Sequence, residues 1–145
     1  MTPAPHDDSR IDQACAVPFR RRGNLTEVCL ITSSAGKWIF PKGYVEGGES
    51  EAGIALLEAE EEAGLHGEII GEPLGCIQMT KSRKQLTVIA FLMKVSRTDV
   101  IWNESHRRER RWVSLTDAAE LVTDAELLDL LQATADRIAA ECFNT

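Results

Sequence analysis

Long hydrophobic runs, paired cysteines and aromatic residues are all scarce in this sequence. No apolar run reaches the roughly 20 residues of a membrane-spanning helix, and residues 1–10 have no apolar signal core, so we expect neither membrane insertion nor secretion. Aromatic residues make up only 6% of the 145 residues, and we find no internal repeat or low-complexity stretch. The four cysteines are scattered: Cys15, Cys29, Cys76 and Cys142. Their spacing argues against a disulfide framework or zinc site and favours reduced, buried thiols in a cytoplasmic protein.

What remains is the composition of one globular domain. Hydrophobic residues make up 43% of the chain and charged residues 27%, enough apolar material for a core. We expect a flexible tail over residues 1–12 and a single domain over 13–145. The net charge of −7 argues against a protein that coats nucleic acid, so we expect no nucleic-acid partner.

The charges are unevenly distributed. No Lys or Arg lies between Lys42 and Lys81, whereas seven acidic residues fall between Glu46 and Glu62. Twelve of the sixteen basic residues form four short groups elsewhere. An acidic block without local counter-charge indicates bound cations, and separate basic groups indicate an anionic ligand; ordinary solvated faces are the alternative for any one group.

Turn residues and apolar patterns predict a mixed sheet with helices packed on it. Strands are expected over 14–19, 27–32, 37–44, 68–70, 74–79, 86–95 and 111–113, the first two joined by a turn at 22–24. A helix is predicted from Ser50, as N-cap, to Ala63, with Gly64 after its end. Capping-box spacing predicts two more helices, starting near Asp117 and Thr123.

The last of these helices is expected to run to about residue 142. It would bury one stripe formed by Leu127, Leu131, Ile138 and Cys142. Strands and helices alternate without a regular rhythm, which is why a mixed rather than a parallel sheet is expected.

The helix after Gly43 carries the chemistry. Glu58, Glu61 and Glu62 are spaced i, i+3 and i+4, so all three carboxylates point the same way and repel unless a cation lies among them. Carboxylate oxygens suit Mg²⁺ or Mn²⁺. A solvated acidic face is the alternative reading. The preceding Gly-rich loop favours a site, because glycine lets backbone approach a metal or phosphate closely.

Residues 43–65 resemble the signature of the Nudix hydrolases. Gly43, five residues, Glu49, seven residues and then Leu57-Glu58-Ala59-Glu60-Glu61-Glu62-Ala63-Gly64-Leu65 match it at every defining position but one, where Leu57 replaces the family's Arg. The resemblance implies a Nudix fold of α/β class, a mixed β-sheet sandwiched between α-helices (α/β/α).

Flanking residues look like one branch of that family. Trp38-Ile39-Phe40-Pro41-Lys42-Gly43, the strand end at Phe19-Arg20, Ser82-Arg83-Lys84-Gln85 and the late segment from Trp102 to Trp112 are similar to diphosphoinositol polyphosphate phosphohydrolases and related dinucleoside polyphosphate hydrolases. The resemblance covers roughly residues 14 to 125.

The family's functional residues transfer position by position. Glu58, Glu61, Glu62 and the Gly43 carbonyl match metal-ligand positions, and Glu58, Glu61 and Glu62 the catalytic ones. In the family, a metal-activated water attacks a phosphorus of the anhydride. The general base varies between members: Glu61 is the candidate within the motif, and Glu104 and Glu109 are candidates outside it.

The basic groups then have an implied task, because Arg and Lys can hold the substrate's phosphate oxygens. The positions that the resemblance places toward substrate are Arg20, Lys42, Arg83, Lys84, Arg108 and Arg111. Trp38 and Trp112 could stack a base, although packing at strand ends is the more ordinary role.

Leu57 leaves two readings open. The chain is either an enzyme in which metal or a basic residue from elsewhere replaces the missing Arg, or a weakened Nudix domain that binds polyphosphates without turnover. The retained carboxylates favour the enzyme.

We therefore expect a cytoplasmic, Mg²⁺- or Mn²⁺-dependent pyrophosphohydrolase. Its expected partner is a polyphosphorylated small molecule, with diphosphoinositol polyphosphates or dinucleoside polyphosphates as first candidates. Nucleotide sugars, oxidised nucleotides and capped RNA ends are alternatives, and a homodimer is left open.

Overall fold

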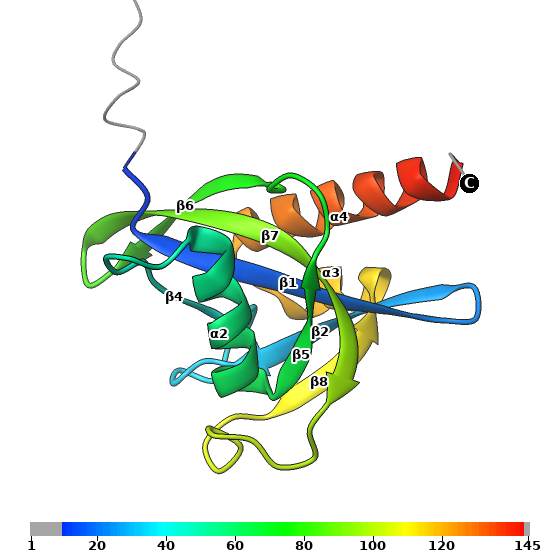
Figure 1. Ribbon diagram of the computed structural model, residues 1–145, viewed down its shortest axis with the longest axis horizontal. Coiled ribbons are helices and arrows are strands. Elements are labelled where there is room, and N and C mark those ends of the chain that lie inside the picture. Colours follow the sequence, from blue (N-terminus) through cyan, green and yellow to red (C-terminus); the bar gives the residue numbers. More distant parts are fainter. Residues whose placement is uncertain (1–9, 144–145) are drawn as a thin grey trace, which may run out of the picture.

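The computed structural model describes residues 10–143, which form eight strands and three helices (Figure 1). The strands are β1 (Gln13–Arg22), β2 (Leu25–Thr32), β3 (Trp38–Ile39), β4 (Lys42–Tyr44), β5 (Leu65–Ile69), β6 (Gly75–Lys81), β7 (Lys84–Thr98) and β8 (Arg110–Ser114). The helices are α2 (Glu51–Ala63), α3 (Leu115–Leu121) and α4 (Ala125–Phe143). None of the helices in this part of the chain has the length and apolar content needed to cross a bilayer.

The eight strands form one mixed sheet around β1. The order is β3-β2-β1-β7-β5, with β4 also paired to β1, β6 to β7 and β8 to β2. The β1–β7 pair is parallel and the other pairs are antiparallel. A parallel pair at the centre is buried on both faces, which explains the continuous apolar run at the start of β1. Gly23, with a φ of 64°, turns β1 into β2 as predicted.

Helices cover both faces of the sheet, which confirms the α/β/α sandwich (Figure 1). Side chains of β1 alternate between the two cores: Ala14 and Ala16 pack toward α2, whereas Cys15 and Val17 pack toward α3 and α4. Ile54, Ala55 and Ala59 of α2 are buried as expected. So are Leu127, Leu131 and Ile138 of α4, whereas the side chain of Cys142 lies outside the described residues.

The predicted ends of α2 are confirmed. The Ser50 side chain accepts a hydrogen bond from the Gly53 amide at 2.9 Å, and Gly64 closes the helix in the left-handed conformation with a φ of 67°. An N-cap hydroxyl satisfies an amide that has no partner within the helix, and glycine reaches positive φ without a side-chain clash. Both ends of the carboxylate-bearing helix are therefore fixed by local sequence.

Several predicted boundaries differ from the structure. The helix α3 begins at Leu115 rather than near Asp117, because the Ser114 hydroxyl accepts from the Asp117 amide and acts as the cap. The helix α4 begins at Ala125, one residue later than it would with Thr123 as the N-cap. The expected strand over 37–44 is split into β3 and β4 by Phe40 and Pro41.

The cysteine prediction holds for two residues and is wrong for a third. Cys15 and Cys29 are buried free thiols, and burial raises the pKa of each to about 12. Cys76 is exposed. Its neighbour Ile77 packs against the core under α4, so the alternation of the strand turns Cys76 outward.

The N-terminal tail expected over 1–12 lies mostly outside the described residues. Its last residue, Asp12, already belongs to the hydrogen-bonded sheet region. The Thr87 amide donates to the Asp12 side chain at 2.9 Å, and the Val45 amide donates to its carbonyl at 3.0 Å.

Candidate active site at the carboxylate helix

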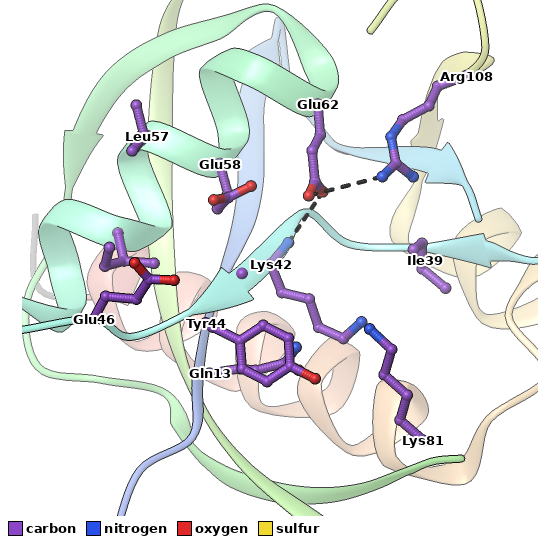
Figure 2. Close-up of a pocket in the computed structure, with 12 residues that line it drawn as sticks. Gln13, Ile39, Lys42, Tyr44, Glu46, Leu57, Glu58, Glu62, Lys81 and Arg108 are labelled. Atoms are coloured by element: carbon purple, nitrogen blue, oxygen red, sulfur yellow. Dashed lines mark hydrogen bonds and ion pairs between the residues drawn. The ribbon is translucent and has the colours of Figure 1, made fainter. Parts of the chain in front are cut away.

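Two of the three predicted carboxylates converge on a cavity beside β4. Glu58 and Glu62 point from α2 toward this short strand (Figure 2) and line a cavity of about 440 Å³ together with Lys42 and Gly43. The i, i+4 spacing places both carboxylates on one helix face, and the buried alanines on the adjoining face pack the helix against the sheet. The sequence thus fixes which face of α2 meets the cavity.

Glu62 is a buried carboxyl with 8% of its surface exposed. Its Oε1 accepts a hydrogen bond from the Lys42 amide at 3.3 Å, and its Oε2 lies 3.8 Å from the Arg108 guanidinium. Burial raises the pKa of Glu62 to about 8, and its hydrogen bond with Glu58 adds to the rise, although the charge of Arg108 opposes it. A second carboxylate this close favours a proton shared by the pair, or a cation between them.

Glu58 lies directly against the backbone of Gly43. A Cβ at position 43 would overlap the Glu58 carboxylate, so only glycine permits this approach. Burial raises the pKa of Glu58 as well, and the charges of Glu61 and Glu104 act in the same direction. The glycine of the motif is therefore explained by contact with a carboxylate, not by an unusual backbone angle.

Arg108 supplies the cation that position 57 lacks. Leu57 is 42% exposed on the cavity rim, whereas Arg108, from the segment between β7 and β8, lies beside Glu62. Its Nε donates to Glu104 at 2.6 Å and its Nη1 to the Thr32 carbonyl at 2.8 Å. A guanidinium held by several acceptors is a rigid counter-charge. A basic residue from elsewhere in the chain thus stands beside the motif.

Glu104 completes this ion-pair network. Burial acts to raise its pKa, but the hydrogen bonds and charges of Arg108 and Arg107 outweigh burial and lower it. Its Oε2 is 3.1 Å from the Arg107 guanidinium. Glu104 is therefore an ionised carboxylate near Glu58, although both of its oxygens are engaged by arginines.

A second cavity of about 480 Å³ adjoins the first and differs from it in charge, because carboxylates and cations line the first whereas cations are the charged groups that line the second. The two share five lining residues: Gln13, Ile39, Lys42, Lys81 and Arg108. The second also contains Arg107, and its lining within the described chain includes no carboxylate. The side chain of Lys42 runs away from α2 toward Lys81 (Figure 2). A ligand spanning both cavities would meet carboxylates at one end and cations at the other.

Other predicted site residues lie outside these two cavities. Glu61 is half-buried next to Glu58 but does not line either cavity. Arg20 pairs with Glu27 at 2.8 Å and stacks on Trp112, far along β1. Their predicted contacts with metal or substrate stay predictions.

The remaining predicted cations are exposed. Arg83 and Lys84 stand at the tip of the β6–β7 hairpin, where Ser82 and Arg83 form the turn with φ of 51° and 67°. Arg111 lies 5.3 Å from the ring of Trp38. Trp38 and Glu109 line a neighbouring cavity whose lining includes neither Glu58 nor Glu62. The structure therefore gathers Lys42 and Arg108 at the site, but not the other four predicted cations.

Lys81 and Gln13 line the site, although neither was predicted as a site residue from the sequence. Lys81 belongs to a basic group that was noted, but only the fold brings it to Lys42, with its Nζ 5.3 Å from the ring centre of Tyr44. Gln13 is 3% exposed, and its Oε1 is buried without a hydrogen-bond partner in the described structure. A polar residue at the start of an apolar strand was the available signal for Gln13.

The donor set at this site fits a divalent cation. In the described part of the chain no three His, Cys, Asp or Glu side chains converge as a ready-made ligand set. Glu58 and Glu62 nevertheless converge beside the Gly43 backbone, in a cradle that any Cβ would fill. Two carboxylates and a backbone carbonyl are hard oxygen donors suited to Mg²⁺ or Mn²⁺, with open positions for phosphate or water. Glu58, Glu62 and the Gly43 carbonyl are the groups that would hold the ion.

Fold and site together define a class: an α/β/α domain whose acidic helix meets a cavity for an anionic ligand. The model of the NUDIX domain matches residues 9–133. The chain therefore belongs to the Nudix hydrolase family.

Similar proteins include members of several branches. The chain is 38% identical over 128 residues to Nudix hydrolase 21, chloroplastic, of Arabidopsis thaliana, covering 83% of this chain and 64% of that one. It is 34% identical over 100 residues to diphosphoinositol polyphosphate phosphohydrolase 3-alpha of Mus musculus, covering 66% of this chain and 60% of the relative. The chain thus spans less than two thirds of either relative.

A solved structure covers nearly all of both chains. The C. elegans Ap4A hydrolase in a binary complex superposes with a TM-score of 0.77 at 27% identity, covering 90% of this chain and 99% of that one.

Proposed function

We propose that this chain is a divalent-metal-dependent hydrolase of phosphoanhydride bonds in polyphosphorylated small molecules. The observation that carries the proposal is the charge division of the joined cavities, with Glu58 and Glu62 at one end and Lys42 and Lys81 at the other. A polyphosphate chain satisfies both ends, because its oxygens can share a cation with the carboxylates and meet the lysines directly.

Each residue has a distinct part in the proposed reaction. Lys42 and Lys81 hold phosphate oxygens of the substrate, and Arg108 offsets charge beside Glu62. A divalent metal, when bound, supplies positive charge against the reacting phosphate and activates water. The water oxygen bonds to phosphorus, the bond from phosphorus to the bridging oxygen breaks, and a carboxylate takes the water proton. Glu61 of the family motif, next to Glu58 on α2, is the candidate for this role, because Glu58 and Glu62 are the carboxylates that would hold the ion.

The proposed substrates are diphosphoinositol polyphosphates or dinucleoside polyphosphates. Relatives named for both are similar to this chain: a diphosphoinositol polyphosphate phosphohydrolase at 34% identity and an Ap4A hydrolase at 27%. The two substrate types differ in the number of phosphate groups that they present to Lys42 and Lys81.

The alternative is a Nudix domain that binds polyphosphates without turnover. Leu57 in place of the family's Arg, and Glu61 outside the cavity lining, are the observations in its favour. The observation against this alternative is the buried Glu62 with its Arg108 partner. If Glu58 and Glu62 had no function, burying the two carboxylates would only destabilise the fold.

The test is a substrate panel with Mg²⁺ or Mn²⁺, comprising a diphosphoinositol polyphosphate, a dinucleoside polyphosphate and a nucleotide sugar. We expect turnover of one of the first two, and a loss of about 10²-fold or more in Glu62→Gln with the fold intact. Glu60→Gln is the matched control, since Glu60 is an exposed glutamate of the same helix. An active Glu62→Gln with unchanged metal dependence contradicts the site, and binding without turnover across the panel favours the alternative.

A second test concerns the cationic end of the cavity. Lys81→Met should raise the KM for a highly phosphorylated substrate more than for a nucleotide sugar, because each lost cation faces more negative charge. The double variant Arg83→Ala with Lys84→Ala tests whether the hairpin tip, which is exposed, adds to this effect. An equal rise in KM for both substrate types would show that these basic residues are only surface charge.

A further inference from the structure

The end of α2 is held by one segment, residues 99–110, that follows β7. The Asp99 amide donates to the Gly64 carbonyl at 2.8 Å, and the Glu104 amide donates to the Glu61 carbonyl at 3.2 Å. Two side chains of the segment reach the carbonyls in between. The last turn of the helix thus has every outward carbonyl from Glu61 to Gly64 satisfied from outside the helix.

Trp102 and Arg110 make those two side-chain contacts. The Trp102 indole Nε1 donates to the Glu62 carbonyl at 2.8 Å, and the Arg110 Nη1 donates to the Ala63 carbonyl at 2.7 Å. The guanidinium of Arg110 stacks on the Trp102 ring, 4.0 Å from its centre. A Cβ at Gly64 would overlap the Trp102 side chain, so the ring lies tightly against the helix end.

Electrostatics gives Arg110 a second reason to be there. The last turn of α2 contains no basic residue, although it carries Glu60, Glu61 and Glu62. The carbonyl end of a helix is partially negative, and a cation beside it is stabilising. Arg110 supplies this charge from β8.

We propose that Trp102 and Arg110 are positioning residues, which fix the last turn of α2 so that Glu62 meets the metal and substrate in the productive geometry. The proposal rests on the proposed function of Glu58 and Glu62. The same segment contacts the Glu62 side chain through Arg108, so one segment holds both the backbone and the carboxylate of Glu62. Ligand groups of a metal site must be held to within about 0.5 Å. Even a small displacement of the last turn of α2 would therefore weaken metal binding.

The variant Trp102→Phe tests this, because it keeps an aromatic ring for Arg110 to stack on and removes the Nε1 donor together with the second ring of the indole. We expect the Kd for Mn²⁺, measured directly from the electron paramagnetic resonance of the free ion, to rise about 5-fold, the loss typical of one hydrogen bond. The metal concentration for half-maximal rate should rise by the same factor, while the substrate KM at saturating metal stays within about 2-fold.

Arg110 gives an independent series. Arg110→Met should weaken Mn²⁺ binding at least as much as Trp102→Phe, and Arg110→Lys should recover part of the affinity, because it restores the charge and one donor. The matched control is Arg137→Met. Arg137 lies on α4 and also donates to backbone carbonyls, those of Ile70 and Pro73, both at 3.3 Å. This control should lower the melting temperature without changing Mn²⁺ affinity.

The outcomes separate the two proposals. If wild-type protein binds Mn²⁺ and Glu62→Gln does not, but Trp102→Phe and Arg110→Met bind it as wild type does, the positioning role is refuted and the proposed function stands. Changes in Trp102→Phe that match those of Arg137→Met would also refute it, since both variants would then be only destabilised. No Mn²⁺ binding by the wild type would overturn both proposals.

Discussion

Without metal, the buried proton on Glu62 should make this protein less stable as the pH rises. The folded protein keeps that proton until about pH 8, whereas an ordinary glutamate, as in the unfolded chain, releases it near 4.5. Between these values the folded state binds more protons than the unfolded state, so the free energy of unfolding falls with increasing pH. Above the folded pKa, the carboxylate pair is ionised and this contribution is lost.

The size of the effect follows from the same two values. At 1.36 kcal/mol for each tenfold change, the ceiling is roughly 5 kcal/mol for complete ionisation of Glu62. We expect about half of this, since Glu58 shares the proton and Arg108 already lies 3.8 Å away to receive the ionised form. For a chain of this size, the corresponding fall in melting temperature between pH 5 and pH 8 is about 5–10 °C.

The assay is thermal unfolding from pH 5 to pH 8 in a chelator, for wild type, Glu62→Gln and Glu60→Gln. Glu62→Gln carries no charge to titrate, so its melting temperature should fall less, and at pH 8 it should exceed that of wild type. Glu60→Gln should follow wild type, because Glu60 is exposed. Parallel curves for wild type and Glu62→Gln would refute the reasoning.

Metal provides the second half of the same experiment. Mg²⁺ competes with the proton for Glu58 and Glu62, so its stabilising effect on wild type should grow as the pH rises. At a concentration 100 times its Kd, a ligand contributes about 2.7 kcal/mol. Mg²⁺ should stabilise the Glu62→Gln variant only slightly, because one of the two ligand carboxylates is missing. A metal effect that is equal in both proteins would place the ion elsewhere.

Three further variants test single contacts. Gly43→Ala should displace Glu58 and weaken Mn²⁺ binding by about 10-fold or more, measured by direct titration, because the new Cβ overlaps the carboxylate. Leu57→Arg should lower the metal concentration for half-maximal rate by only about 2-fold with no loss in melting temperature, since Leu57 is exposed and one helical ion pair is worth about 0.3–0.5 kcal/mol; a clear drop in melting temperature would mean that Leu57 packs. Arg108→Met should lower kcat by far more than the effect of about 2-fold expected at position 57, because it leaves Glu62 and Glu104 without their shared cation; unchanged kinetics would remove Arg108 from the site.

Much of this fold could be predicted because its signals are local. Ser50 and Gly64 mark the ends of α2 through contacts within one turn, and the apolar run of β1 reports a strand buried on both faces. The predicted start of α3 was wrong because the local signal there was ambiguous. Two capping residues were available, and the structure uses Ser114 rather than Asp117.

The site divides in a similar way. Glu58 and Glu62 follow from helical spacing, and Gly43 from the family motif, so the acidic end of the cavity was predictable. The cationic end depends on where separate strands meet. Lys81 reaches Lys42 only because β6 and β4 both flank the central β1–β7 pair, and no pattern along the chain encodes that meeting.

The β6–β7 hairpin shapes how this site can diversify. Its tip is exposed, its two turn residues are Ser82 and Arg83, and its strand β6 pairs with β7. Insertions and substitutions at such a tip leave the core and α2 untouched. Lengthening the hairpin at its tip would add new side chains beyond Lys81 while Glu58 and Glu62 keep their places. Over evolutionary time, such a lineage can exchange one phosphorylated substrate for another without rebuilding the part that breaks the bond.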